Sequence, residues 1–233
     1  KMEERAERCF AEYAFVAAFS MYLLGILVAI GVSAVLHLID RKKEVNYLLI
    51  ELPEYKLPDA HTVGIYVWEK VKDYLVKAGT TIFVATLIIW ALLHLGPSGY
   101  VDGTAIENSF AGYIGKFLSP AFAPVGLGFW QIVVALIAGI SAKEVVVSSC
   151  AVILGAAQGS DAFMTALAGI GFGSLNAICL MVFCLLYIPC VATLATIRKE
   201  SKSWKWTIFT AVFQLVVAWV ITLIVYQIGS LIV

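Results

Sequence analysis

A lysine and a glutamate stand side by side inside one of the most apolar stretches of this chain. Lys143 and Glu144 interrupt the run from Phe129 to Leu154 in the segment AGISAKEVVVSSC, and Ser148 and Ser149 follow them. A charged side chain at the centre of a bilayer costs roughly 2.5–3.5 kcal/mol on insertion scales. Because adjacent residues of a helix do not face each other, the two charges cannot neutralise one another along one continuous helix. We therefore expect a functional element here rather than a plain membrane span.

A second group of polar side chains surrounds a proline in the apolar segment LLYIPCVAT. Pro189 removes a helical hydrogen-bond donor and leaves a carbonyl free about one turn earlier. Around it, Tyr187, Cys190 and Thr193 recur every three residues and could share one face. Half-helix ends at mid-membrane are common substrate sites in transporters. Thiolate, carboxylate and hydroxyl groups together suit a transition-metal cation better than sodium or a sugar.

Structural explanations compete with this interpretation at each position. A cysteine in an apolar helix commonly acts as a small hydrophobe, and Pro189 could simply kink its helix. Serine and threonine hydroxyls often bond back to their own helix. Lys143 and Glu144 could form a structural pair that meets polar groups on another helix. We expect His37 and His94 near opposite membrane faces and His61 in a loop, so the three histidines do not suggest a shared metal site.

The composition is that of an integral membrane protein. Of the 233 residues, 61% are hydrophobic and 14% are charged, and soluble domains carry about 25% charged residues. The formal net charge is zero, and no basic cluster with interleaved aromatic residues indicates nucleic-acid binding. The chain has no G-x-x-x-x-G-K-[ST] segment for a nucleotide. We expect no enzymatic activity from it and no bound cofactor.

The hydropathy pattern divides the chain into an N-terminal flank (1–12), a transmembrane helix (13–39), a cytoplasmic link (40–77) and a larger membrane domain (78–233). Within the link, the four-residue spacing of apolar side chains from His61 to Lys77 predicts an amphipathic helix in the membrane interface. Within the membrane domain, the pattern predicts a span at 78–95, an element at about 128–156, a broken helix at 175–197 and a span at 207–231.

Positive charge sets the topology of these segments. Seven Lys and Arg residues lie in the link between the first two spans and four lie at 198–205, whereas 96–127 holds only Lys116. Both basic links face the cytoplasm only if 128–156 enters the membrane and returns on the same side. The charge count therefore predicts a re-entrant hairpin with its tip at or near Lys143 and Glu144. Non-helical backbone at that depth is tolerated where protein or a water-filled cavity surrounds it.

Several motifs in this order resemble the C-terminal membrane half of FeoB-type ferrous iron transporters. They are ELPEYKLP, VWEKVKDYLVKAGTTIF, SPAFAPVG, AKEVVVSS, LLYIPCVATLATIRKE, SWKW and VYQIG, and the likeness runs from about Tyr22 to Val233. The resemblance implies an all-α gate fold, similar to half of a concentrative nucleoside transporter, with transmembrane helices, a re-entrant hairpin and a broken helix. It agrees with the topology that the charges predict.

The resemblance also implies a substrate and its residues. Fe²⁺ would be transported, not held as a cofactor, across a bacterial or archaeal cytoplasmic (inner) membrane. We expect Cys190 as a soft ligand, and Glu144, Ser148, Ser149 and Thr193 as further metal-site residues. Lys143, Pro189 and Tyr187 would serve the gate or its structure, and Lys143 would neutralise Glu144 or another carboxylate when the site is empty.

The expected partners besides Fe²⁺ and the lipid bilayer follow from the same resemblance. An N-terminal GTPase domain and a first gate copy of the same protein are absent from this sequence, and small FeoA-like or FeoC-like proteins and a homo-oligomer are further expectations. Two alternatives remain open at this stage. One is a nucleoside-type or other solute transporter that would use Asn176 and Gln158, and the other is a non-transporting membrane partner subunit.

Overall fold

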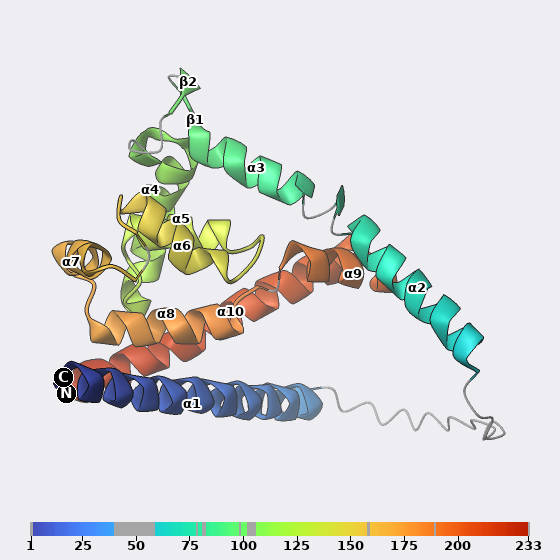
Figure 1. Ribbon diagram of the computed structural model, residues 1–233, viewed down its shortest axis with the longest axis horizontal. Helices are drawn as coiled ribbons and strands as arrows, with labels where there is room; N and C mark the ends of the chain where they lie inside the picture. The colour runs from blue at the N-terminus through green and yellow to red at the C-terminus, as the bar shows by residue number, and fades with distance from the viewer. Residues whose placement is uncertain are drawn as a thin grey trace. The chain divides into compact units, whose positions relative to one another are not determined.

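The computed structural model describes residues 2–39, 59–77, 79–80, 83–97, 99–101, 106–157, 159–188 and 190–232. The chain divides into two compact units, Lys1–Val71 and Lys72–Val233, which are considered separately. Apart from the two-residue strands β1 (Leu95–Gly96) and β2 (Gly99–Tyr100), the described elements are helices (Figure 1). The predicted all-α membrane class is confirmed.

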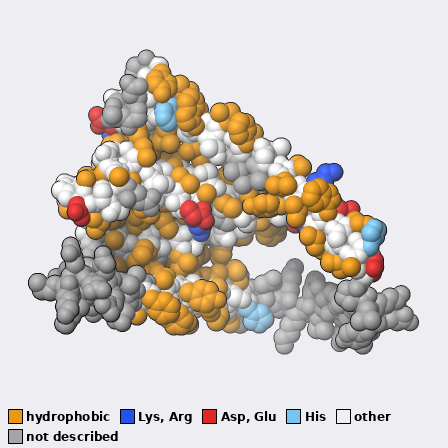
Figure 2. Space-filling view, in the orientation of Figure 1, with side chains coloured by type: hydrophobic (Ala, Val, Ile, Leu, Met, Phe, Trp, Pro, Cys, Tyr) orange, Lys and Arg blue, Asp and Glu red, His pale blue; other side chains and the backbone are white. Residues whose placement is uncertain are grey.

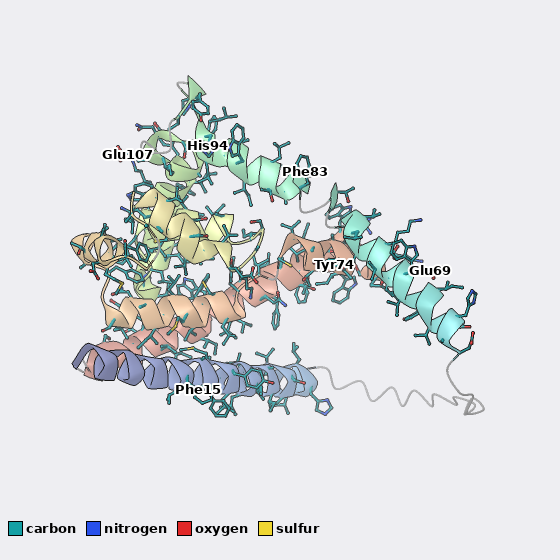
Figure 3. The ribbon with its side chains drawn as sticks, in the orientation of Figure 1. Phe15, Glu69, Tyr74, Phe83, His94 and Glu107 are labelled. Carbon is teal, nitrogen blue, oxygen red and sulfur yellow. The ribbon has the colours of Figure 1, made fainter. Side chains whose placement is uncertain are left out.

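Helix α1 (Met2–Ile39) dominates the first unit. Its stretch Phe15–Leu38 has a mean hydropathy of 2.4 and no buried residue. At 1.5 Å per residue these 24 residues extend about 36 Å, which exceeds the ~30 Å hydrocarbon core of a bilayer. Large apolar side chains such as Phe15 project outward from it (Figure 3). The predicted span 13–39 falls in this helix, and the predicted flank 1–12 continues it without a break from Met2.

Helix α2 (Ala60–Lys77) covers the predicted amphipathic segment, with Glu69 and Tyr74 on its surface (Figure 3). It begins after Asp59, whose Oδ2 accepts hydrogen bonds from the Thr62 backbone N–H at 3.2 Å and the Thr62 hydroxyl at 3.0 Å. These bonds lower the pKa of the Asp59 carboxyl, because they stabilise its charged form. The rest of the predicted link, 40–58, lies outside the described residues.

Helix α3 (Phe83–His94) occupies most of the predicted span 78–95. Its 12 residues extend about 18 Å, so α3 alone is shorter than the hydrocarbon core. The His94 ring stacks on Trp90 with ring centroids 4.9 Å apart and lies 6.1 Å from the ring of Tyr100 in β2 (Figure 3). The short 3₁₀ helix η2 (Ile106–Asn108) then leads into α4 (Phe110–Phe122). The Glu107 carboxylate of η2 lies 3.6 Å from the Lys116 ammonium of α4.

A sharp corner separates α4 (Phe110–Phe122) from α5 (Trp130–Ala138). The 3₁₀ helix η3 (Ala123–Val125) follows α4, and the two helical directions differ by 103°. Gly126 makes the turn with a φ of 75°, a left-handed conformation that favours glycine. A Cβ atom at this position would collide with the ring of Tyr226. The corner therefore requires glycine both for its backbone and for close packing.

Helices α5 and α6 (Val145–Ile153) form a helical hairpin around the turn 139–144. Each has nine residues and extends about 13 Å, so neither crosses a 30 Å hydrocarbon core. Lys143 and Glu144 end the turn, directly before α6. The predicted hairpin at 128–156 thus corresponds to a helix–turn–helix with the charged pair at its turn. Helix α7 (Asp161–Gly169) follows it.

The C-terminal part consists of α8 (Ser174–Leu186), α9 (Val191–Ser201) and α10 (Trp204–Ile232). Helix α10 packs along α8 (Figure 1), and its Trp219 donates a hydrogen bond to the Ala121 carbonyl at 3.0 Å. The predicted broken helix 175–197 comprises α8, the break at 187–190 and most of α9. The predicted span 207–231 falls within α10. Within the described ranges, three helical stretches are long and apolar enough to cross a membrane, or four if the bent α4–α5 pair counts as one.

The buried core of the second unit lies where α5, α6, α8 and α10 meet. Ile132, Val146, Phe183 and Ala218 are almost completely buried there. The Phe183 ring contacts Phe122 edge-on at a centroid distance of 5.5 Å. Outside this core, hydrophobic side chains cover much of the visible surface, and charged groups are sparse (Figure 2). Such a surface is suited to contact with lipid or other apolar partners.

Substituting Gly126→Ala should lower the thermal denaturation midpoint of the detergent-solubilised protein by several degrees. A left-handed non-glycine residue costs about 1–2 kcal/mol, and the new methyl group would also displace the Tyr226 ring. Gly169→Ala is the matched control, because its Cβ position has no atom within 4 Å other than those of its chain neighbours and its own helix backbone. Equal midpoints for the two variants would contradict the tight corner.

Candidate functional site

The turn of the hairpin is shaped for close approach to another element. A Cβ atom on Gly139 would lie 2.6 Å from the Tyr187 hydroxyl oxygen and would also overlap the Val146 side chain. Glycine at 139 therefore lets the turn approach the region between α8 and α9. Within the turn, the Ser141 hydroxyl donates to the Ala138 carbonyl at 2.8 Å and so ties the end of α5 to the turn.

The helix break exposes backbone carbonyls at the end of α8. Tyr187 has extended backbone angles (φ −70°, ψ 178°), and its N–H donates to the Phe183 carbonyl at 2.8 Å as the last bond of the helix. Cys190 is extended as well (φ −57°, ψ 157°), and α9 begins at Val191. Pro189, which predicted the break, lies outside the described residues. Carbonyls at such a helix end carry partial negative charge and attract cations.

The turn and the break meet through hydrogen bonds. The Val191 N–H, at the start of α9, donates to the Ile140 carbonyl at 3.1 Å. The Lys143 ammonium donates to the Leu185 carbonyl at 3.2 Å and the Tyr187 carbonyl at 3.3 Å. The same ammonium lies 5.1 Å from the centroid of the Tyr187 ring, a cation–π distance. Lys143 therefore caps the end of α8 from a position more than 40 residues away in the sequence.

Cys190 and Thr193 form a small polar pair on the first turn of α9. The Cys190 sulfur lies 3.3 Å from the Thr193 hydroxyl oxygen, and the two side chains are partly accessible. The Lys143 ammonium is close enough to interact electrostatically with the thiols of Cys184 and Cys190. Lys143 thus binds two helix-end carbonyls just before the break, and a thiol and a hydroxyl follow directly after it. This combination offers both soft and hard ligand atoms to a cation.

The other sequence-predicted residues lie apart from this group. Glu144 is exposed, and no described residue forms a hydrogen bond or an ion pair with its carboxylate. Lys143 donates to the carbonyls of Leu185 and Tyr187, and the expected neutralisation of a carboxylate by this lysine stays a prediction. The Ser148 hydroxyl donates to the Val145 carbonyl of its own helix at 3.1 Å, and Ser149 is half-buried on α6. Among the described residues, no three His, Cys, Asp or Glu side chains form a metal-binding group.

Sequence reasoning missed the backbone groups that join the two elements. The carbonyls of Ile140, Leu185 and Tyr187 all take part, and no side-chain pattern identifies a carbonyl. Pro189 was the one signal that pointed to free carbonyls nearby. Asn176, considered as a possible sugar-binding residue, has its amide engaged: its Nδ2 donates to the Gly126 carbonyl at 2.6 Å and its Oδ1 accepts from the Gly173 N–H at 3.0 Å.

Comparison with known families gives two matches. Residues 75–204 match the Gate family, described as "Nucleoside recognition", and residues 18–70 match the family described as "Ferrous iron transport protein B C terminus". No solved structure matches the chain significantly.

Curated relatives match nearly the whole chain. It is 42% identical to the "Fe(2+) transporter FeoB" of Staphylococcus aureus (strain MSSA476), over 95% of this chain and 33% of the relative. The protein of that name from Methanocaldococcus jannaschii is 38% identical over the same shares. A Porphyromonas gingivalis "Fe(2+) transport protein A/Fe(2+) transporter FeoB fusion protein" is 30% identical, over 95% of this chain and 31% of its own length. The chain spans about a third of the length of these relatives.

Replacing Tyr187 by phenylalanine should leave the thermal denaturation midpoint unchanged or raise it. The hydroxyl is buried without a hydrogen-bond partner among the described residues, and such a group costs roughly 1–3 kcal/mol. Tyr187→Leu is the contrasting variant, because it removes the ring that Lys143 and Phe183 contact, and it should lower the midpoint. A clear drop for Tyr187→Phe would show that the hydroxyl is hydrogen-bonded in the protein.

Proposed function

Because this chain belongs to the Gate family and resembles the C-terminal membrane part of ferrous iron transport proteins, we propose that it forms part of a pathway for Fe²⁺ across a bacterial or archaeal cytoplasmic membrane. The observation that carries the proposal is the contact between the hairpin turn 139–144 and three residues at the helix break, Leu185, Tyr187 and Val191. Two interrupted elements that meet inside an apolar protein provide backbone ligands without a continuous helix between them.

The ligand atoms at the break suit Fe²⁺. Cys190 would coordinate the ion as a thiolate, which favours transition metals over Mg²⁺ and Ca²⁺. The Thr193 hydroxyl, 3.3 Å from that sulfur, and the carbonyls of Leu185 and Tyr187 would supply oxygen ligands. Conduction requires that such a shell bind the ion weakly enough for it to leave again.

Lys143 would act as a tethered cation that occupies the carbonyls between transport events. Its two hydrogen bonds satisfy carbonyls that would otherwise be unpaired at the end of α8, and hydrogen bonds to charged groups contribute about 1.5–3 kcal/mol each. Fe²⁺ and the Lys143 ammonium would repel each other if both occupied these carbonyls, because both are positively charged. The lysine must therefore withdraw when the ion binds, and since it belongs to the hairpin turn, its movement would shift the gate.

Glu144, Ser148 and Ser149 would act at the entrance rather than at the break. Glu144 is exposed at the start of α6, where a carboxylate would attract a cation and receive the ammonium of Lys143 after it withdraws. The serine hydroxyls on α6 would offer oxygen atoms to a passing ion if the hairpin opened. Pro189 would maintain the break, and the Tyr187 ring would guide the lysine.

The complete transporter requires parts beyond this chain, which spans about a third of its relatives. We expect a GTPase domain and a first gate copy elsewhere in the full-length protein, and GTP binding would set the position of the hairpin. The fusion of Fe(2+) transport protein A to the Porphyromonas gingivalis relative supports a partner of that kind. A FeoC-like protein and a homo-oligomer are further proposals.

Replacing Cys190 by serine in the full-length protein should reduce Fe²⁺ uptake about tenfold or more at an unchanged level in the membrane. Serine keeps the size of the side chain but removes the soft thiolate ligand. Radioactive Fe²⁺ uptake under reducing conditions measures the effect, and an excess of nucleoside tests the alternative substrate class. Cys179→Ala is the control, because Cys179 is buried in the core of the second unit. Unchanged uptake would rule out Cys190 as a ligand.

Replacing Lys143 by methionine should lower the Fe²⁺ concentration at half-maximal uptake about tenfold, equivalent to about 1.4 kcal/mol. Methionine keeps the length of the side chain but removes the charge that competes with the ion. Lys143→Arg retains the charge and should stay close to the unmodified protein. If Lys143 only stabilises the break, the methionine variant will instead lose membrane level with no change in half-saturation.

A further inference from the structure

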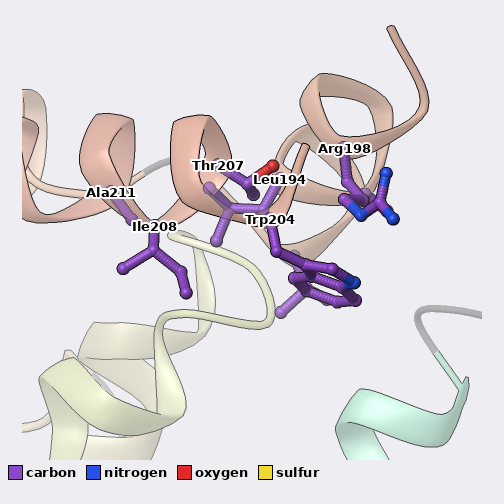
Figure 4. A pocket seen from close by; sticks show the side chains of 8 residues that line it. Leu194, Arg198, Trp204, Thr207, Ile208 and Ala211 are labelled. Atoms are coloured by element: carbon purple, nitrogen blue, oxygen red, sulfur yellow. The ribbon is translucent and has the colours of Figure 1, made fainter. Parts of the chain in front are cut away.

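A pocket opens between α9 and α10, on the far side of the break from α8. Its volume is about 460 Å³. The two helices are joined by Lys202 and Ser203, and Lys202 reverses the chain with a left-handed φ of 51°. On α9, the lining side chains repeat with helical spacing at Val191, Leu194, Ala195 and Arg198. On α10, the same spacing places Trp204, Thr207, Ile208 and Ala211 opposite them (Figure 4).

The walls of this pocket are apolar except at one end. Arg198 and Trp204 lie together at that end, whereas Ile208 and Ala211 lie farther along α10 (Figure 4). The Thr207 hydroxyl is already engaged, since it donates to the Ser203 carbonyl at 3.1 Å. The remaining polar group of the lining is the guanidinium of Arg198, so the pocket has one apolar part and one cationic end.

Arg198 has no anionic partner among the described residues. Its guanidinium carbon lies 5.0 Å from the centroid of the Trp204 ring, a cation–π distance. Its Nε is buried, and no described residue accepts a hydrogen bond from it. An arginine presents a planar set of donors that matches phosphate geometry. Arg198 therefore places a stacked guanidinium, without an anionic partner among the described residues, at the end of an apolar pocket.

The pocket lies where the chain passes between two candidate membrane spans, 174–201 and 204–231. Four basic residues cluster there with a single acid, Glu200; they are Arg198, Lys199, Lys202 and Lys205. Trp204 and Trp206, both in the first turn of α10, are 65% and 63% exposed, and tryptophan is enriched at the membrane–water interface. The excess of positive charge puts this end at the cytoplasmic leaflet, which carries anionic lipid.

We propose that the pocket binds one acyl chain of an anionic phospholipid of the cytoplasmic leaflet, with the lipid phosphate held by Arg198. The apolar walls would cover the chain, and the surrounding lysines would add charge complementarity to the headgroup. The acyl chain of a zwitterionic lipid would also cover the apolar walls, but its headgroup would give the basic cluster no net negative charge to pair with. Free phosphate would pair with Arg198 but leave the apolar walls uncovered. The proposal does not rest on the proposed Fe²⁺ pathway, although the pocket shares helix α9 with it.

Quenching of Trp204 fluorescence by brominated acyl chains tests this proposal. The full-length protein is reconstituted in phosphatidylcholine vesicles that contain either brominated phosphatidylglycerol or the same amount of brominated phosphatidylcholine. Parallel measurements on Trp204→Phe and Trp206→Phe variants isolate the signal of each tryptophan. We expect several-fold stronger quenching of Trp204 by phosphatidylglycerol than by phosphatidylcholine, and no such preference at Trp206.

Two variants that each remove one positive charge, and one variant that fills the pocket with a larger side chain, complete the test. Arg198→Met should weaken phosphatidylglycerol binding at least tenfold, whereas Lys199→Met, which removes an exposed charge from the neighbouring position, should weaken it no more than about fivefold, as one surface charge contributes. Ala195→Phe should remove the preference while every charge remains. If that variant does not fold, the comparison of Arg198→Met with Lys199→Met still decides the outcome.

The opposite results would overturn the proposal. Equal quenching by the two lipids, or equal losses for Arg198→Met and Lys199→Met, would reduce the effect to general surface electrostatics. Displacement of brominated phosphatidylglycerol by inorganic phosphate would indicate a site for a free anion. Quenching of Trp204 no stronger than that of Trp206 would mean that another segment of the full-length protein fills the pocket.

Discussion

The second unit depends on how the carbonyls at the broken end of α8 are satisfied. In hydrocarbon an unpaired carbonyl costs several kcal/mol, so a helix cannot end there without a donor. Lys143 supplies that donor to Leu185 and Tyr187, and the Val191 N–H binds the Ile140 carbonyl in return. The hairpin turn and the break thus satisfy each other, and each would be costly in this environment without the other.

Under the proposed function, this dependence would give the gate two alternative states. The cation-binding end of α8 would be occupied either by the transported ion or by the Lys143 ammonium as a reversible substitute. The close contact at Gly139 and the cation–π contact with Tyr187 would belong to the state in which Lys143 occupies the carbonyls. The pocket beside Arg198 lies on the other helix that leaves the break, α9, so a lipid there would steady the helix that carries Cys190 and Thr193.

Much of the fold could be predicted because the membrane constrains sequence strongly. The apolar lengths at 13–39 and 207–231 fall within α1 and α10, and the charge distribution favoured a return of the chain at 128–156, where two nine-residue helices and a turn are found. For the segment 78–95, hydropathy predicted one full span, but it could not predict that the helix α3 within it has only 12 residues. The corner at Gly126 also escaped prediction, because its need for glycine arises from the Tyr226 ring a hundred residues later.

By itself the sequence determined the membrane class, the two polar segments and the proximity of Cys190 to Thr193, because composition and helical spacing are local properties. The tertiary structure alone decided what Lys143 contacts. A lysine beside a glutamate suggested a pair of opposite charges, yet the lysine binds two carbonyls and the glutamate is exposed. The physical reason is that every residue carries a carbonyl, so only the path of the backbone can decide which ones are left free and which side chain reaches them.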